Sequence, residues 1–197
     1  MYYSKNKSKK ETMDEVSLEI ERCDRCGMSE VCTNKVIGAG SLDTKVILIG
    51  EAPGKEEDKT GKPFVGRAGR LLDELLEEAC IERGDIFITN ILKCRPPDNR
   101  KPRKGEIKVC LDHLIDQLKI IKPRIIAPMG NVAASVFFEI YDLERNSIGN
   151  VHGKTYRIEA DWGNVILMPI YHPAAAVYNR NLKPELVNDM KKISELM

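Results

Sequence analysis

Short apolar runs alternate along the chain with segments of helical periodicity, and this alternation constrains the fold more than any other feature. The apolar runs cover residues 45–50, 86–90, 124–128 and 165–170. Helical spacing of apolar residues is found in residues 66–81, 105–121, 131–141 and 184–196. Strands without a polar face are typical of a parallel sheet that is covered by helices on both sides. The pattern therefore predicts a three-layer α/β/α fold around a central, mostly parallel four-stranded sheet.

The length of the chain is suited to one substantial hydrophobic core. It has 197 residues, of which 42% are hydrophobic, and this is short for two separate cores. We expect a flexible polar tail over residues 1–10 and a single domain over residues 11–197. Within that domain, residues 13–22 are suited to a short helix, and residues 143–164 form a connection with one or two short strands.

The charge balance excludes a globally basic protein. Lys and Arg number 31 and Asp and Glu number 30, so the net charge is only +1, and any surface for nucleic acid must be local. The N-terminal region lacks the apolar stretch of a signal peptide, and no segment has the ~20 apolar residues of a membrane span. We therefore expect a cytoplasmic monomer with no membrane role. In such a protein, six cysteines are better explained as metal ligands or core residues than as disulfides.

Three of the expected strands end in loops that carry polar side chains. The first is followed by Gly50-Glu-Ala-Pro-Gly54 and then by Gly61-Lys-Pro-Phe64, the second by Asn90-Ile-Leu-Lys-Cys-Arg-Pro-Pro97, and the last by Tyr171-His-Pro-Ala174. Ligands of open parallel sheets bind at the carboxyl ends of the strands. The three loops are therefore expected to meet at one functional site.

These motifs, in this order, resemble those of family 4 uracil-DNA glycosylases, which carry an iron–sulfur cluster. Each motif is common by itself, but four of them at strand ends are specific, and the resemblance extends from Cys23 to about Pro184. It implies an enzyme of base excision repair that flips uracil out of single- or double-stranded DNA. The enzyme then hydrolyses the N-glycosidic bond and leaves an abasic site.

The residue types fit the recognition of a flipped base. The amide of Asn90 is able to donate to uracil O4 and accept from N3–H, whereas cytosine presents the opposite arrangement. The ring of Phe64 is suited to stack on the base, which contributes about 1 to 3 kcal/mol. His172 is suited to donate to uracil O2 as negative charge develops on the leaving base.

The first loop supplies the remaining base-pocket residues and the candidate carboxylates. The resemblance places Gly50, Ala52, Pro53 and Gly54 around the uracil. Ala52 stands where related glycosylases often carry an aspartate, so Glu51, ranked before Glu57, is the candidate for orienting water or stabilising the sugar cation.

Four cysteines form a second group of functional candidates. Cys23 and Cys26 lie close in sequence, Cys94 follows in the second loop, and Cys110 lies 16 positions after Cys94. Four thiolates suit either zinc or an iron–sulfur cluster. The resemblance implies a structural [4Fe-4S] cluster on these four, with Cys32 as the rival ligand and Cys80 as a core residue.

Two segments are candidates for contact with DNA. The first is basic and also includes Lys93 and Lys108; its proposed phosphate contacts are Arg95, Arg100, Lys101, Arg103 and Lys104. In the second, the resemblance implies a loop after His172 that enters the duplex, with Pro173, Tyr178, Asn179 and Arg180 as contacts.

Several alternatives remain open at the level of sequence. Pro53 and Gly54 could simply end a strand, Asn90 could cap a turn, Phe64 could be core, and His172 could lie on the surface. The chain could also be a non-catalytic nucleic-acid binding module with a metal or cluster, or a redox protein. A neighbouring glycosylase family with another base preference is a closer rival.

Overall fold

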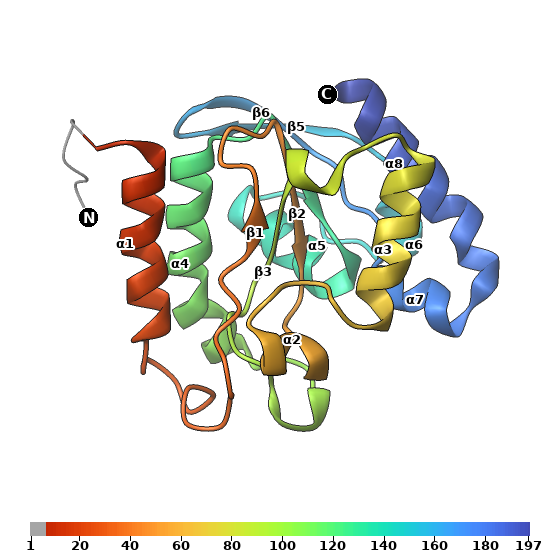
Figure 1. Ribbon diagram of the computed structural model, residues 1–197. Helices are drawn as coiled ribbons and strands as arrows, with labels where there is room; N and C mark the ends of the chain where they lie inside the picture. The colour runs from red at the N-terminus through yellow and green to blue at the C-terminus, as the bar shows by residue number, and fades with distance from the viewer. Residues whose placement is uncertain (1–6) are drawn as a thin grey trace.

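The architecture is built on a six-stranded sheet. The computed structural model describes residues 7–197 (Figure 1). The strand order is β1-β3-β2-β4-β6-β5. The strands are β1 (Ala39–Gly40), β2 (Val46–Gly50), β3 (Phe87–Asn90), β4 (Ile125–Pro128), β5 (Tyr156–Ala160) and β6 (Gly163–Leu167). The four central strands are parallel, as the sequence predicts, while β1 and β5 pair antiparallel at the two edges.

Helices cover both faces of this sheet. They are α1 (Lys9–Glu21), α2 (Lys55–Thr60), α3 (Arg67–Glu78), α4 (Lys104–Ile121), α5 (Gly130–Ile140), α6 (Ile148–Val151), α7 (Pro173–Tyr178) and α8 (Lys183–Leu196). Helices α1, α4 and α5 contribute to the core on one face, and α3, α7 and α8 to the core on the other (Figure 1). The three-layer α/β/α expectation is confirmed.

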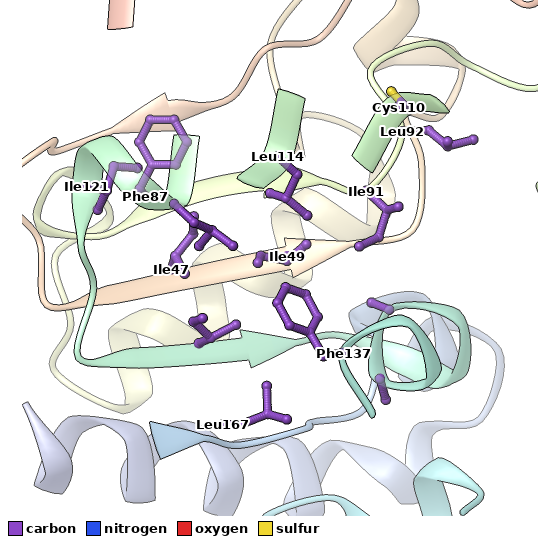
Figure 2. Packing of buried hydrophobic residues seen from close by; sticks show 14 of the residues in the cluster. Ile47, Ile49, Phe87, Ile91, Leu92, Cys110, Leu114, Ile121, Phe137 and Leu167 are labelled. Atoms are coloured by element: carbon purple, nitrogen blue, oxygen red, sulfur yellow. The ribbon is translucent and has the colours of Figure 1, made fainter. Parts of the chain in front are cut away.

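The alternation of side chains along β2 shows how one sheet serves two cores. Ile47 and Ile49 belong to the core beside α4 and α5, whereas Val46 and Leu48 belong to the core beside α3 and α8. Figure 2 shows Ile49 between Leu114 of α4 and Phe137 of α5, and Ile47 farther along β2 toward Phe87. Because every side chain of β2 is buried, this strand needs the continuous apolar run that identifies it in the sequence.

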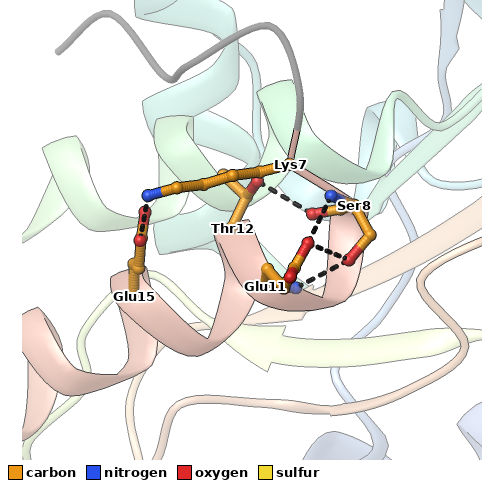
Figure 3. A network of polar contacts seen from close by, with 5 residues as sticks. All are labelled: Lys7, Ser8, Glu11, Thr12 and Glu15. Carbon is orange, nitrogen blue, oxygen red and sulfur yellow. Dashed lines mark hydrogen bonds and ion pairs between the residues drawn. The ribbon is translucent and has the colours of Figure 1, made fainter.

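The first helix begins earlier than the sequence analysis expects. Ser8 Oγ accepts a hydrogen bond from Glu11 N at 3.2 Å, and Glu11 Oε2 accepts one from Ser8 N at 2.8 Å (Figure 3). This reciprocal capping box satisfies two backbone donors at the helix start, so α1 begins at Lys9 and not at residue 13. Residues 1–6 of the expected tail lie outside the described part of the chain.

The sheet brings the ends of its central strands level. Gly50 at the end of β2 lies beside Asn90 at the end of β3, and Ile49 lies beside Pro128 of β4. The loops that follow these strands therefore leave the sheet together, at the carboxyl ends of the strands. Within residues 7–197, no helix is both long and apolar enough to cross a membrane.

Candidate active site

A cavity of about 450 Å³ opens at the carboxyl ends of the central strands. Its lining comes from the loop after β2 with α2, from Phe64 and the start of α3, from the end of β3 and the loop after it, and from His172 and α7. The residues are Glu51, Ala52, Pro53, Gly54, Glu57, Phe64, Ala68, Asn90, Pro96, Asn99, Arg100, His172, Ala174 and Tyr178. The three loops that the sequence analysis singled out thus contribute to one cavity.

Asn90 presents a buried amide to this cavity. Its side chain is 1% exposed, and its Oδ1 has no hydrogen-bond partner among residues 7–197. A Cβ atom on Gly50 would lie 2.3 Å from this oxygen and 2.8 Å from Phe64 Cζ. The absence of a side chain on Gly50 therefore leaves room for both Asn90 and Phe64. Because its Oδ1 has no partner, Asn90 retains an acceptor for a ligand.

Phe64 forms an apolar wall, and its backbone is held in an unusual conformation. It has φ = 52°, in the left-handed region, which is costly for a non-glycine residue. Arg83 Nη2 donates to the carbonyl oxygens of Pro63 (2.9 Å) and Phe64 (3.1 Å). A Cβ atom on Gly69 would lie 1.9 Å from Phe64 O, so only glycine allows α3 to approach this closely. These contacts fix the ring with its centroid 5.6 Å from that of His172.

His172 is a neutral side chain with one defined donor. Burial lowers its pKa to about 4, against an opposing effect of Glu57. Its Nδ1 accepts a hydrogen bond from Ala174 N at 3.1 Å, at the start of α7. Since Nδ1 is the acceptor in the neutral ring, the proton lies on Nε2. His172 can therefore donate one hydrogen bond to a ligand near neutral pH.

The two candidate carboxylates have different environments. Glu57 Oε1 accepts hydrogen bonds from the backbone N–H groups of Val65 (2.8 Å) and Gly66 (2.9 Å), so this carboxylate holds the Phe64 loop in place. Glu51 is half-buried in the cavity lining, and burial raises the pKa of its carboxyl while Lys101 opposes the rise. The carboxylate of Glu57 is already hydrogen-bonded by the protein, so that of Glu51 is the more available to a ligand.

The basic segment after β3 is partly engaged with the protein. Arg100 forms two hydrogen bonds with the Glu106 carboxylate, which lowers the pKa of Glu106 to about 2, and Arg95 Nε donates to Asn99 Oδ1 at 2.8 Å. Lys101, Arg103 and Lys104 are exposed. Arg100 alone of these basic candidates lines the cavity.

Lys93 does not belong to this basic surface, contrary to the sequence-based expectation. Its side chain is 2% exposed, and its ammonium contacts backbone and side-chain oxygens inside the protein. A buried lysine of this kind is unable to contact DNA phosphates.

The segment after His172 is a helix and not the expected loop. Pro173 is buried at the first helical position of α7, where proline is favoured because no backbone N–H is needed. It is therefore unsuited to the expected DNA contact. Tyr178 is 87% exposed at the cavity rim, and Asn179 and Arg180 follow it on the surface.

A second, smaller cavity collects the four predicted cysteine ligands. Cys23, Cys26, Cys94 and Cys110 all line it, together with His113 of α4. Cys32 is not in its lining, but its Sγ lies 2.9 Å from Cys94 Sγ. In residues 7–197, no three metal-binding side chains already stand close enough to hold an ion.

Cys94 and Cys110 are the buried thiols of this cavity, and Lys35 and Lys93 also line it. Burial raises the pKa of Cys94, with a further contribution from the hydrogen bond to Cys32, and burial also raises the pKa of Cys110 against an opposing effect of Lys93. The backbone N–H of Lys93 donates to Cys110 Sγ at 3.3 Å. Burial therefore disfavours the thiolate form of Cys94 and Cys110.

Cys80 is not the core residue that the sequence analysis predicts. It is exposed and has φ = 56°, just beyond the end of α3. The apolar spacing of α3 does not continue to Cys80 because the helix ends at Glu78.

Some site residues were not identified from the sequence. Ala68, Pro96, Asn99 and Ala174 line the cavity, and Arg83 supports Phe64 from outside it. The Pro-Pro-Asp-Asn run after Arg95 signals a tight turn at the rim, but no sequence signal connects Arg83 to Phe64.

Comparison with known proteins agrees with this geometry. Residues 37–192 match the model of the uracil DNA glycosylase superfamily. The chain is 44% identical to the type-4 uracil-DNA glycosylase of Archaeoglobus fulgidus, and the alignment covers 94% of each protein. It is 42% identical to the type-4 enzyme of Thermotoga maritima, again over 94% of each. Identity to the type-5 uracil-DNA glycosylase of Pyrobaculum aerophilum is 27%, over 68% of this chain and 63% of that one.

Both the match over most of the chain and the higher similarity to the type-4 relatives favour the same family assignment. The chain belongs to the uracil DNA glycosylase superfamily and, within it, to the type-4 family.

Proposed function

We propose that this protein is a uracil-DNA glycosylase of base excision repair, which hydrolyses the N-glycosidic bond of a flipped uracil and leaves an abasic site. The observation that carries the proposal is the convergence of Asn90, Phe64 and His172 on one cavity at the ends of the strands. One of these side chains offers an amide, one an aromatic face and one a neutral N–H donor.

Asn90 provides the discrimination between bases. Its Oδ1 has no protein partner, so it is free to accept from uracil N3–H while the amide nitrogen donates to O4. Cytosine presents a donor at C4 and no hydrogen at N3, which leaves both groups of Asn90 mismatched. A site whose buried polar groups are left unpaired rejects such a ligand strongly.

His172 stabilises the departing base. Bond cleavage leaves the electron pair of the N1–C1′ bond on uracil, and the negative charge spreads to O2. A hydrogen bond from neutral Nε2–H strengthens as this charge develops, which lowers the barrier. Water adds to the sugar cation and loses a proton to solvent. Glu51, half-buried beside the cavity, orients this water or stabilises the cation, and Glu57 supports the loop of Phe64.

The four cavity cysteines fit a [4Fe-4S] cluster. Cys23 and Cys26 bring the segment after α1, Cys94 the loop after β3 and Cys110 the helix α4 to one place. Cys94 and Cys110 are buried and Cys23 and Cys26 partly buried, and the Lys93 N–H beside Cys110 Sγ is a donor of the kind that stabilises cluster sulfur. The cluster supplies a structural cross-link between these three segments.

DNA binds across the cavity mouth in this proposal. The proposed phosphate contacts are Arg95, Arg100, Lys101, Arg103 and Lys104, and the proposed contacts after His172 are Tyr178, Asn179 and Arg180. Tyr178, which is exposed at the cavity rim, is our candidate for the side chain that fills the gap left by a flipped base. We also expect the protein to act as a monomer in the cytoplasm.

The test is incubation of the purified protein with an oligonucleotide that contains one uracil, followed by alkali and strand sizing. Oligonucleotides with cytosine or thymine at that position are the controls. Alkali-dependent cleavage at uracil alone supports the proposal, and Asn90→Asp is expected to reduce the preference for uracil over cytosine. Absence of cleavage by protein with full iron content would leave a cluster-bearing, non-catalytic binding module as the better explanation.

A further inference from the structure

We propose that Lys93 is a positioning residue for base recognition, because its buried ammonium holds the Asn90 end of β3 against helix α4. The inference rests on the proposed role of Asn90 as the base reader. Lys93 itself does not line the base cavity, so it acts through Asn90 and not on the substrate.

The ammonium of Lys93 is surrounded by neutral oxygen acceptors. Nζ donates to Thr89 Oγ1 and Gln117 Oε1, both at 2.7 Å, and to Asn90 O at 3.0 Å, and it lies 3.4 Å from Ile37 O. Three donors are thereby used on oxygen partners. Lysine is rarely buried to this extent. Within residues 7–197, the oxygen atoms that bond its Nζ all belong to neutral groups, so Nζ is held by dipoles of the residues that it joins, and burial lowers the pKa of Lys93 to about 7.

These partners belong to three separate parts of the chain. Thr89 and Asn90 are in β3, Gln117 is in α4, and Ile37 precedes β1. The partners also bond to one another: Thr89 Oγ1 donates to Ile37 O at 2.7 Å, and Gln117 Nε2 donates to the same oxygen at 2.9 Å. Removal of the ammonium would leave buried acceptors without their donor, which is costly in a low-dielectric interior.

The contact with Asn90 O matters for the orientation of the base reader. On one side, β3 is held by its parallel pairing with β2, where Asn90 lies beside Gly50. On the other side, the Lys93 ammonium holds the Asn90 carbonyl group. The Asn90 side chain has no partner on Oδ1, so its position depends on its backbone and on the tight space beside Gly50 and Phe64. A displacement of about 1 Å at a reacting or recognition group can reduce activity by two orders of magnitude.

The test compares Lys93→Met, which keeps an unbranched apolar side chain and removes the donors, with the unaltered protein. Lys10→Met, on the exposed face of α1, controls for the loss of a positive charge. Four quantities are measured: single-turnover uracil release, the inhibition constant of free uracil, affinity for a duplex with an abasic site, and the midpoint of thermal unfolding. Uracil release is expected to fall about tenfold or more and the inhibition constant to rise similarly, with abasic-duplex affinity unchanged.

A second pair of variants keeps the proposal testable if Lys93→Met does not fold. Thr89→Val preserves the shape of the side chain but removes the hydroxyl acceptor, whereas Thr89→Ser retains it. We expect weaker inhibition by free uracil in Thr89→Val, and behaviour close to the unaltered protein in Thr89→Ser. Rescue by serine distinguishes the hydrogen bonds of the hydroxyl, to Lys93 and to Ile37 O, from a general effect on strand β3.

Three results would overturn the assignment. The first is a folded Lys93→Met with unchanged uracil release and inhibition. The second is a parallel loss of abasic-duplex affinity, which indicates general disruption. The third, where Lys93→Met does not fold, is equal behaviour of the two Thr89 variants. If the unaltered protein released no uracil, the proposed function would be contradicted as well. That outcome is distinguishable from the other three because it is seen without any variant.

Discussion

The base cavity and the cysteine cavity share the segment after β3, where Asn90 and Cys94 lie four residues apart. The two cavities are nevertheless built in different ways. The walls of the base cavity are fixed by contacts within the protein: Glu57 holds the loop of Phe64, Arg83 holds its carbonyl, and Ala174 orients His172. In the cysteine cavity, four side chains from three segments face one another, with thiols whose pKa is raised by burial at Cys94 and Cys110. The side chains of the first cavity are thus positioned by hydrogen bonds within the protein, and those of the second are the proposed ligands of a cluster.

The two kinds of construction have different consequences for ligand binding and for folding. A preformed pocket reduces the cost of ordering side chains when the base enters. A site whose ligands come from distant segments instead couples binding to folding, because those segments are brought together by the bound group. Changes at the cysteine cavity are therefore expected to affect the whole domain, and changes at the base cavity to affect catalysis alone.

The largest effect is expected from Cys94→Ser, which removes one proposed cluster ligand. Nearly all bound iron and the cooperative unfolding transition are expected to be lost together, as measured by iron analysis and thermal denaturation. Cys80→Ser is the matched control, because Cys80 is exposed and lies away from the cavity lining. Full iron content in Cys94→Ser would exclude Cys94 as a required ligand and direct attention to Cys32.

His172→Ala is expected to have a large effect confined to chemistry. Loss of the Nε2–H donor should reduce single-turnover uracil release by about 10²- to 10³-fold, with affinity for uracil-containing DNA little changed and thermal stability retained. The comparison of rate with affinity is decisive. If both fell by the same factor, His172 would be a binding residue and not one that stabilises the departing base.

A smaller effect is expected from Arg83→Ala, which removes the donor to the Phe64 carbonyl without touching the cavity. The loss of one or two hydrogen bonds of ~1 kcal/mol each should weaken inhibition by free uracil about three- to thirtyfold. Arg70→Ala, at an exposed position on α3, should leave inhibition unchanged. Identical inhibition constants in the two variants would show that Gly69 and Glu57 hold the Phe64 loop by themselves.

The last prediction concerns stability at acid pH. Because burial lowers the pKa of His172 to about 4, the unfolded chain binds a proton at this residue between pH 6.5 and 4 while the folded protein does not. Stability from His172 is therefore present above about pH 6.5 and is lost as the pH falls toward 4. Denaturant unfolding at pH 7 and pH 4.5 should show a smaller acid loss for His172→Gln than for the unaltered protein; equal losses would contradict a buried neutral histidine.

The central fold could be predicted because its signals are local. The fully buried strand β2 needs a continuous apolar run, and α3 and α4 need apolar residues at helical spacing, so each pattern is visible in a short window. The edge strand β1 has only two residues, and its pairing with β3 depends on the tertiary structure. Helix α7 was read as a loop, although Pro173 followed by three alanines is a favourable helix start.

The candidate site shows the same division between local and distant information. The motifs predicted that Asn90, Phe64 and His172 would meet, because strand ends converge at one edge of a parallel sheet. They misplaced Lys93, whose charge suggested the surface, because its partners Gln117 and Ile37 lie 24 and 56 positions away. The link between Arg83 and Phe64 likewise requires the packing of α3 against the strand ends.

The four-residue step from Asn90 to Cys94 also limits how this protein is able to change over generations. Within this step, Ile91 N and Leu92 N bond to the carbonyls of Gly50 and Glu51, and Lys93 is bonded through both its backbone and its side chain. An inserted or deleted residue there would shift the base reader and a cysteine of the second cavity in a single mutational event. A change of length in this segment therefore affects both sites at once, whereas a substitution is able to alter one of them alone.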